Sequence, residues 1–204
     1  KKKKPVILST GMNDIRSIKK SVNIFRKYKI PYALLHCTNI YPTPNHLVRL
    51  NCLTELKNKF NDAVIGISDH TETIYSCLGA VSLGASIIEK HFVDTKKRKG
   101  PDISCSMDNS ELKEMIRGSK LIFASLKGSK KAIKEEKKTI KFAFASVAST
   151  ENIKKGEKFT TDNIFTKRPG SGDFTVKDYK NIIGKYASKN IKKNYQLKKK
   201  DISW

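Results

Sequence analysis

The chain has 204 residues, of which 38% are hydrophobic, and a formal net charge of +23. This length suits one mid-sized domain with a small companion. Such a charge is typical of nucleic-acid binders, but only six of the 42 basic residues are Arg, the side chain that contacts bases and phosphates through two hydrogen bonds. We therefore expect a solvated, lysine-rich surface and no nucleic-acid partner.

The four cysteines, Cys37, Cys52, Cys77 and Cys105, form no CxxC pair and fall in four different predicted elements. This is neither a zinc signature nor a disulfide framework, so a reducing, cytoplasmic location is expected. No apolar run approaches the ~20 residues that cross a bilayer, and no membrane partner is expected. The chain lacks an initiating Met and enters an apolar strand directly after residues 1–4, which suggests that it begins inside a longer protein.

Four strands are predicted in the first 127 residues, beginning near residues 5, 32, 63 and 85. Helical patterns follow them at 14–28, 47–60, 73–83 and 110–126, the last capped by Asp108 or Asn109. This alternation is typical of an α/β protein with a parallel sheet. We expect half of a (β/α)₈ TIM barrel, because the rival open Rossmann-like sheet would carry GxGxxG after its first strand.

Every predicted strand ends on polar residues, and the carboxyl ends of barrel strands are where such folds carry their chemistry. His70 and His91 follow two neighbouring strands, so their imidazoles are expected at the same edge of the sheet. A pair of this kind can share a metal ion or a substrate. The alternative is two strand-end histidines without a ligand. His36, within a strand, and His46, in a loop, are expected to be structural.

The second part of the chain has a different rhythm. Residues 128–141 form a Lys-rich connector, and Phe142–Ala148 alternates like a strand. Residues 168–172 are predicted to be a rigid loop and 178–183 a short helix. This module is small enough to depend on a partner surface for its stability.

Eight motifs stand in a characteristic order along the chain. They are KPVILSTGM at 4–12, LLHCTNIYPTP at 34–44, IGISDHT at 65–71, CLGAVSLGAS at 77–86, EKHF at 89–92, GPDISCSM at 100–107, FAFASV at 142–147 and KRPGSGDF at 167–174. Together they resemble the bacterial sialic acid (N-acetylneuraminate) synthases over nearly the whole chain. The resemblance implies strands five to eight of a (β/α)₈ barrel in residues 1–127, a linker over 128–141 and an antifreeze-like (SAF) domain over 142–204.

These enzymes condense phosphoenolpyruvate with N-acetylmannosamine to give N-acetylneuraminate and phosphate, for capsule or lipopolysaccharide biosynthesis. They need a divalent metal, Mn²⁺ or Mg²⁺. By the resemblance, His70 and His91 are the metal ligands, and Tyr41 and Asp102 are the candidate catalytic residues. The substrate-binding positions that it implies are Ser9, Asn39, Tyr41, Ser68, Asp102, Phe142 and Arg168.

Within that set, the resemblance assigns Ser9, Asn39 and Ser68 to phosphoenolpyruvate and the two candidate catalytic residues to the sugar. By the same resemblance, Phe142 is expected near the acetamido methyl group of the sugar, and Arg168 is expected to reach the sugar site of the partner in a domain-swapped homodimer. Without the resemblance, Tyr41 could be a packing residue, Asp102 a turn residue and Arg168 a surface charge.

The family's first four strands supply the lysines that hold the phosphate and the acid/base glutamates. Nothing here replaces them, since strand alternation turns Lys90 away from the site. The chain alone is therefore expected to be inactive. Two alternatives remain. One is a related synthase for legionaminate or pseudaminate, and the other is a non-catalytic module that binds carbohydrate or a polyanion.

Overall fold

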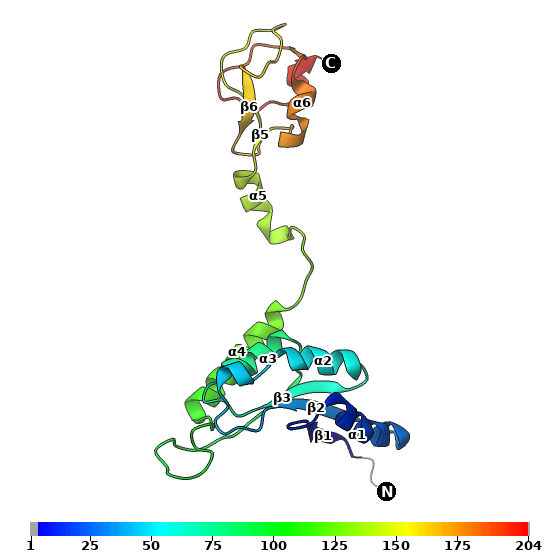
Figure 1. Cartoon of the computed structure of the whole chain (residues 1–204). Helices are drawn as coiled ribbons and strands as arrows, with labels where there is room; N and C mark the ends of the chain where they lie inside the picture. The colour runs from blue at the N-terminus through cyan, green and yellow to red at the C-terminus, as the bar shows by residue number, and fades with distance from the viewer. Residues whose placement is uncertain (1–3, 204) are drawn as a thin grey trace. The chain divides into compact units, whose positions relative to one another are not determined.

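The computed structural model describes residues 4–203, which form two compact units (Figure 1). The first unit runs to Gly128 and the second begins at Ser129. Among the described residues, no helix has the length and apolar character that a membrane span requires.

The first unit alternates strands with helices. Its elements are β1 (Val6–Ser9), α1 (Ile15–Lys27), β2 (Tyr32–Cys37), η1 (Asn45–Leu47), α2 (Asn51–Lys59), β3 (Val64–Asp69), α3 (Tyr75–Ser82), β4 (Ile87–Lys90) and α4 (Asn109–Ser125). The four strands form one parallel sheet in the order β1-β2-β3-β4. A parallel sheet whose spatial order follows the chain order is half of a (β/α)₈ barrel. The four predicted strand–helix units are confirmed.

Two of these helices begin at side-chain caps. Asp14 accepts a 2.7 Å hydrogen bond from the backbone N–H of Ser17 and so starts α1. Asp108 caps α4 and, with Glu111, forms a capping box in which each side chain accepts from the other residue's backbone N–H. The cap predicted at Asp108 is therefore confirmed.

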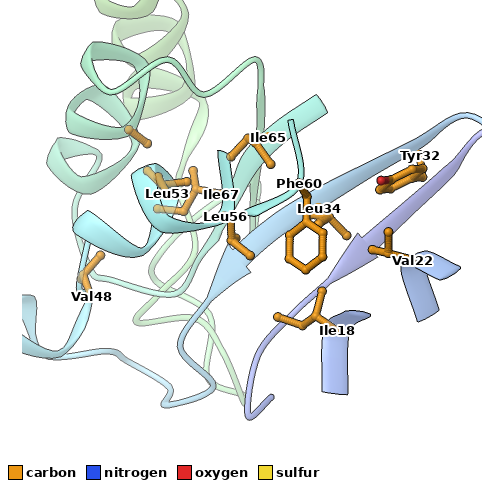
Figure 2. Packing of buried hydrophobic residues seen from close by; sticks show 11 residues of the cluster. Ile18, Val22, Tyr32, Leu34, Val48, Leu53, Leu56, Phe60, Ile65 and Ile67 are labelled. Atoms are coloured by element: carbon orange, nitrogen blue, oxygen red, sulfur yellow. The ribbon is translucent and has the colours of Figure 1, made fainter. Parts of the chain in front are cut away.

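The sheet has a helix-covered face that holds the core of the first unit. Alternate strand residues such as Leu34, Ile65 and Ile67 pack against α1 and α2 on this face (Figure 2). The fully buried positions of this cluster, at most 3% exposed, include Val22, Leu34, Leu53, Leu56, Phe60 and Ile67.

The opposite face of the sheet, called the inner face below, is the one that lines the barrel interior in a complete barrel. Cys37, Ser68 and Glu89 lie in register across β2, β3 and β4, so their side chains share this face. Ile7 on β1 belongs to the same face and is 61% exposed. The inner face is therefore open along β1.

The second unit is built from short elements. They are η2 (Lys134–Glu136), α5 (Lys137–Ala143), β5 (Ser146–Ser149), β6 (Ile164–Lys167), η3 (Val176–Asp178), α6 (Tyr179–Ile182), β7 (Tyr186–Ala187), η4 (Lys199–Asp201) and β8 (Ile202–Ser203). Two antiparallel pairs, β5–β6 and β7–β8, enclose a core of its own. The fully buried members of that core include Val147, Ile153, Phe159, Ile164, Ile182 and Leu197.

The strand predicted over Phe142–Ala148 is wrong in its first half. Helix α5 continues through Ala143, and the backbone N–H of Phe144 still donates to the Ile140 carbonyl at 3.0 Å. Only Ser146–Ser149 pairs as a strand. The run of Lys and Glu before residue 142 is rich in good helix formers, and this helix extends into the alternating Phe/Ala segment.

Candidate functional site

His70 and His91 lie side by side at the carboxyl ends of β3 and β4. They follow Asp69 and Lys90, which are partners in the last pair of the β3–β4 ladder. Their ring centroids are 5.2 Å apart and the rings stand nearly perpendicular, at 75°. The geometry predicted from the strand order is therefore present: two imidazoles at one edge of the sheet.

The orientation of the His70 ring follows from its hydrogen bond. Its Nδ1 lies 3.1 Å from the Thr38 carbonyl oxygen, which can only accept, so Nδ1 carries the proton. The lone pair of Nε2 is then left for a cation, an arrangement common to metal-binding histidines. The Cys37 sulfur lies 3.7 Å from the same Nδ1. His70 is buried, whereas the side chain of His91 is 35% exposed.

Tyr41 completes an aromatic cluster with the two histidines. Its ring centroid lies 4.0 Å from that of His70 and 5.8 Å from that of His91. Burial raises the pKa of the Tyr41 hydroxyl, with smaller contributions from Cys37 and Asp102. The phenol therefore stays protonated at neutral pH and remains a hydrogen-bond donor.

The loop that carries Tyr41 is fastened to the histidine it contacts. The backbone N–H of Thr43 donates to the His70 carbonyl at 2.8 Å. The Thr43 hydroxyl lies 2.6 Å from the Ile40 carbonyl oxygen and 3.1 Å from that of Thr38. These contacts fold the segment between β2 and η1 back over the end of β3, which places the Tyr41 ring against His70.

Asp102 approaches the site from a long loop. Its Oδ2 lies 3.9 Å from His91 Nδ1. Its backbone has φ 62°, and its carbonyl accepts hydrogen bonds from Ser106 Oγ at 2.7 Å and Cys105 Sγ at 3.2 Å. These bonds hold the left-handed turn that directs the carboxylate toward His91.

The residues expected to contact phosphoenolpyruvate lie on strands and loops beside the histidines. Ser68 is buried on β3, in register with Cys37, whereas Ser9, at the end of β1, is exposed. The Asn39 side chain follows β2, and its Oδ1 accepts from the Cys37 thiol at 3.1 Å. All three offer hydroxyl or amide groups without charge. Lys90 points away from the inner face, as predicted.

Two residues near the site have structural roles. His36 lies on the helix-covered face, where its Nε2 bonds to the Val48 carbonyl at 2.7 Å, and burial lowers its pKa. The expectation that His36 is structural fits this contact. Asp69 was not singled out by sequence reasoning, yet its carboxylate is buried and receives hydrogen bonds from Ser76 and Lys90.

Arg168 and Phe142 belong to the second unit. Arg168 is exposed at the end of β6, before a cis peptide bond to Pro169, and lines a hollow of about 640 Å³ together with Phe144 and Val176. Phe142 is 72% exposed on α5. Both side chains are therefore free for a contact outside their own core.

The two imidazoles fit a shared ion. With metal–nitrogen bonds of about 2.1 Å, two imidazoles at neighbouring coordination positions have ring centroids roughly 5 Å apart. Within residues 4–203, no group of three or more His, Cys, Asp or Glu side chains is arranged to hold a metal. Ions such as Mn²⁺, which prefer oxygen ligands, accept water and substrate oxygens at further positions, so two histidines would suffice only for an open site.

Comparison with known proteins gives the family. Residues 1–131 match the model of the NeuB family, and residues 144–203 match that of the SAF domain. The chain belongs to the NeuB family. Its NeuB-family relatives include the N,N'-diacetyllegionaminic acid synthase of Campylobacter jejuni, which is 40% identical over 94% of this chain. The pseudaminic acid synthase of the same organism is 37% identical over 98% of this chain.

A solved structure supports the same fold. The crystal structure of an N-acetylneuraminic acid synthetase from Leptospira borgpetersenii is 35% identical and matches with a TM-score of 0.61. The match covers 66% of this chain and 47% of that one. The chain spans 58% of the length of each of the two Campylobacter relatives.

Proposed function

We propose that this chain forms the metal-binding and sugar-binding side of the active site of a nonulosonate synthase. The reaction is the condensation of phosphoenolpyruvate with N-acetylmannosamine to N-acetylneuraminate and phosphate. The observation that carries the proposal is the contact of His70, His91 and Tyr41 at the carboxyl ends of β3 and β4, in a chain of the NeuB family.

In this proposal, His70 through Nε2 and the ring of His91 hold Mn²⁺ or Mg²⁺. When bound, such an ion supplies a Lewis acid for the aldehyde oxygen of the open-chain sugar. Asp102 lies beside His91 and is 46% exposed, so it can take a proton from a water molecule at the site. The protonated Tyr41 hydroxyl donates a hydrogen bond to a sugar oxygen.

The phosphoenolpyruvate side of the site is incomplete in this chain. Ser9, Asn39 and Ser68 supply neutral donors for carboxylate and phosphate oxygens. The positive charge that a phosphate needs is not provided by Lys90, whose ammonium group is bonded to Asp69. We infer that residues outside this chain hold the phosphate, and that Arg168 serves the sugar site of a partner in a swapped homodimer, with Phe142 near the acetamido group.

A second candidate keeps the reaction and changes the sugar. The 40% identity to an N,N'-diacetyllegionaminic acid synthase and the 37% identity to a pseudaminic acid synthase favour it. The name of the first product requires a sugar with two acetamido groups. The four cysteines are all free thiols, which supports work in the reducing cytoplasm for either enzyme.

The test is an assay with the missing part of the barrel added. The first half of the barrel of the Campylobacter legionaminic acid synthase is supplied as a separate polypeptide or as a fusion. Phosphate release from phosphoenolpyruvate is then measured with N-acetylmannosamine, or with a diacetamido hexose, in the presence of Mn²⁺. Release should require both sugar and metal, and the preferred sugar decides between the two candidates.

Matched variants test the metal assignment. His70→Ala and His91→Ala should each abolish phosphate release, because one imidazole alone holds the ion poorly. His46→Ala changes an exposed histidine of η1 and should leave the rate unchanged. Robust turnover in either site variant would contradict the assignment.

A further inference from the structure

A buried ion pair lies directly behind the two histidines. Lys90 Nζ and Asp69 Oδ2 are 2.6 Å apart, and the two side chains are 1% and 2% exposed. Both residues point to the helix-covered face, so neither contacts the inner face where His70 and His91 lie.

The position of this pair in the sheet is specific. Asp69 and Lys90 are the last residues of β3 and β4 and form the last matched pair of their ladder. The next residue on each strand is a site histidine. Backbone pairing between β3 and β4 therefore stops one residue before His70 and His91, and the ion pair joins the two strands at that point.

Lys90 holds the chain on both sides of His70. Its Nζ donates to the Asp69 carboxylate and also to the Thr71 carbonyl, each at 2.6 Å. Lys90, which precedes His91, thus binds the two residues that flank His70.

Asp69 is held in turn by two hydroxyl groups. The Ser76 hydroxyl on α3 donates to Oδ1 at 2.7 Å, and the Thr71 hydroxyl lies 2.8 Å from Oδ2. The carboxylate is therefore satisfied on both oxygens. Replacing a buried ion pair with an apolar pair often costs no stability, so this network is better explained by the geometry it imposes.

We propose that Lys90 and Asp69 are positioning residues, which act as one unit to hold the imidazoles of His70 and His91 at the separation that a shared ligand needs. The effect passes through the backbone, since the ion pair lies on the other face of the sheet. The inference rests on the proposed function only where it is tested by metal affinity.

The first readout is geometric and needs no metal. In an NMR spectrum of the isotopically labelled 204-residue chain, ring-to-ring NOE cross-peaks are expected between His70 and His91. The variant D69N/K90M should lose them. Phe25 and Tyr32, whose ring centroids are 5.4 Å apart in the same unit, should keep theirs and so report an intact core.

The second readout is the affinity for Mn²⁺ alone, measured by EPR. D69N/K90M should bind Mn²⁺ about 10- to 100-fold more weakly, which is the usual effect of changing residues that support metal ligands. The matched control is R26M/D62N, which removes an ion pair of the same unit whose side chains are 41% and 43% exposed. The control should stay within about two-fold of the unaltered chain.

The possible results separate the two proposals. Unchanged His70–His91 cross-peaks in D69N/K90M overturn the positioning role. If the unaltered chain binds no Mn²⁺ while D69N/K90M loses the His70–His91 cross-peaks, the metal site is refuted and the positioning role is supported. If D69N/K90M does not fold, Ser76→Ala replaces it: weaker ring cross-peaks with Phe25–Tyr32 unchanged support the proposal, and equal intensities overturn it.

Discussion

The Asn39 side chain occupies the space that any side chain at residue 11 would need. A Cβ built on Gly11 would lie 1.7 Å from Asn39 Oδ1 and 2.8 Å from Asn39 Cγ. Glycine just after β1 therefore leaves room for the Asn39 amide that follows β2. Two neighbouring strand ends depend on each other at this contact.

Gly11→Ala should displace the Asn39 amide. We expect a loss of about 0.5–1.5 kcal/mol in the free energy of unfolding, because the clashing atoms are the far end of an exposed side chain that can turn aside. Phosphoenolpyruvate binding by the completed barrel should weaken as well. The measurement is denaturant unfolding of Gly11→Ala, Asn39→Ala and the double variant. Because Asn39→Ala removes the clashing atoms, the double variant should be more stable than the sum of the single effects predicts, and strict additivity would contradict the contact.

The buried His36 should make the stability of the first unit depend on pH. Burial lowers the pKa of this histidine in the folded state, so the unfolded chain binds more protons once the pH falls below its ordinary value near 6.5. The contribution of neutral His36 to the free energy of unfolding is complete above about pH 6.5 and is lost as the pH falls from there toward the lowered pKa of the folded state. Unfolding free energies measured from pH 8 to pH 5 should show this loss.

His36→Gln is the matched test, because Gln can still donate to the Val48 carbonyl that His36 contacts but does not titrate. It should flatten the decrease on acidification. His46→Gln, at an exposed histidine, should keep the full slope. Equal slopes for both variants would show that His36 is not the group responsible.

The ring of Tyr41 should affect Mn²⁺ affinity, and its hydroxyl should affect sugar binding. Tyr41→Phe keeps the ring against His70 and should leave Mn²⁺ affinity within about two-fold, while the KM for the sugar rises about ten-fold through the loss of one hydrogen bond. Tyr41→Ala removes a ring contact worth about 0.5–1.5 kcal/mol and should weaken both. Metal titration and steady-state kinetics measure the two effects. A Tyr41→Phe variant with normal KM would assign Tyr41 to packing alone.

In the second unit, Ser146 should control the loop that follows Arg168. Its hydroxyl accepts from the Gly172 backbone N–H at 2.9 Å and lies 3.2 Å from the Pro169 carbonyl oxygen. Ser146→Ala leaves the Gly172 N–H without this acceptor and should cost about 1–3 kcal/mol of unfolding free energy. Hydrogen exchange of the Gly172 amide should accelerate.

Ser188→Ala is the control in that unit, because its hydroxyl donates to the Lys200 carbonyl and, within the described part of the chain, makes no hydrogen bond to Gly172. It should leave the exchange of the Gly172 amide unchanged. Equal protection of that amide in Ser146→Ala and the unaltered chain would refute the anchoring role.

The strand–helix order of the first unit could be predicted because each strand is a short apolar run that ends on polar residues. The same pattern located His70 and His91, since parallel strands bring their carboxyl ends to one edge. The pairing of Asp69 with Lys90 could not be predicted so directly. It depends on the register between β3 and β4, and a shift of one strand by one residue would have placed the two side chains on opposite faces of the sheet.

Short elements of the second unit were harder to predict. β6 has four residues, Ile164–Lys167, which is too few to show a clear alternation, and it was not predicted as a strand. The Phe/Ala segment from residue 142 alternates like a strand but begins inside α5, whose helix starts at Lys137. The antiparallel pairing with β5 makes the first a strand, and the helix-forming residues before residue 142 make the start of the second a helix.

The two ends of the long loop between β4 and α4 lie next to each other. Phe92 and Met107 form a parallel bridge, and Met107 donates to the His91 carbonyl at 2.8 Å. The loop is thus closed at its base, and lengthening it costs little, since each doubling of a flexible loop costs only about 0.6 kcal/mol. If the proposed function holds, the segment that carries Asp102 can be exchanged for one of another length during evolution, which would alter the sugar specificity without moving His91.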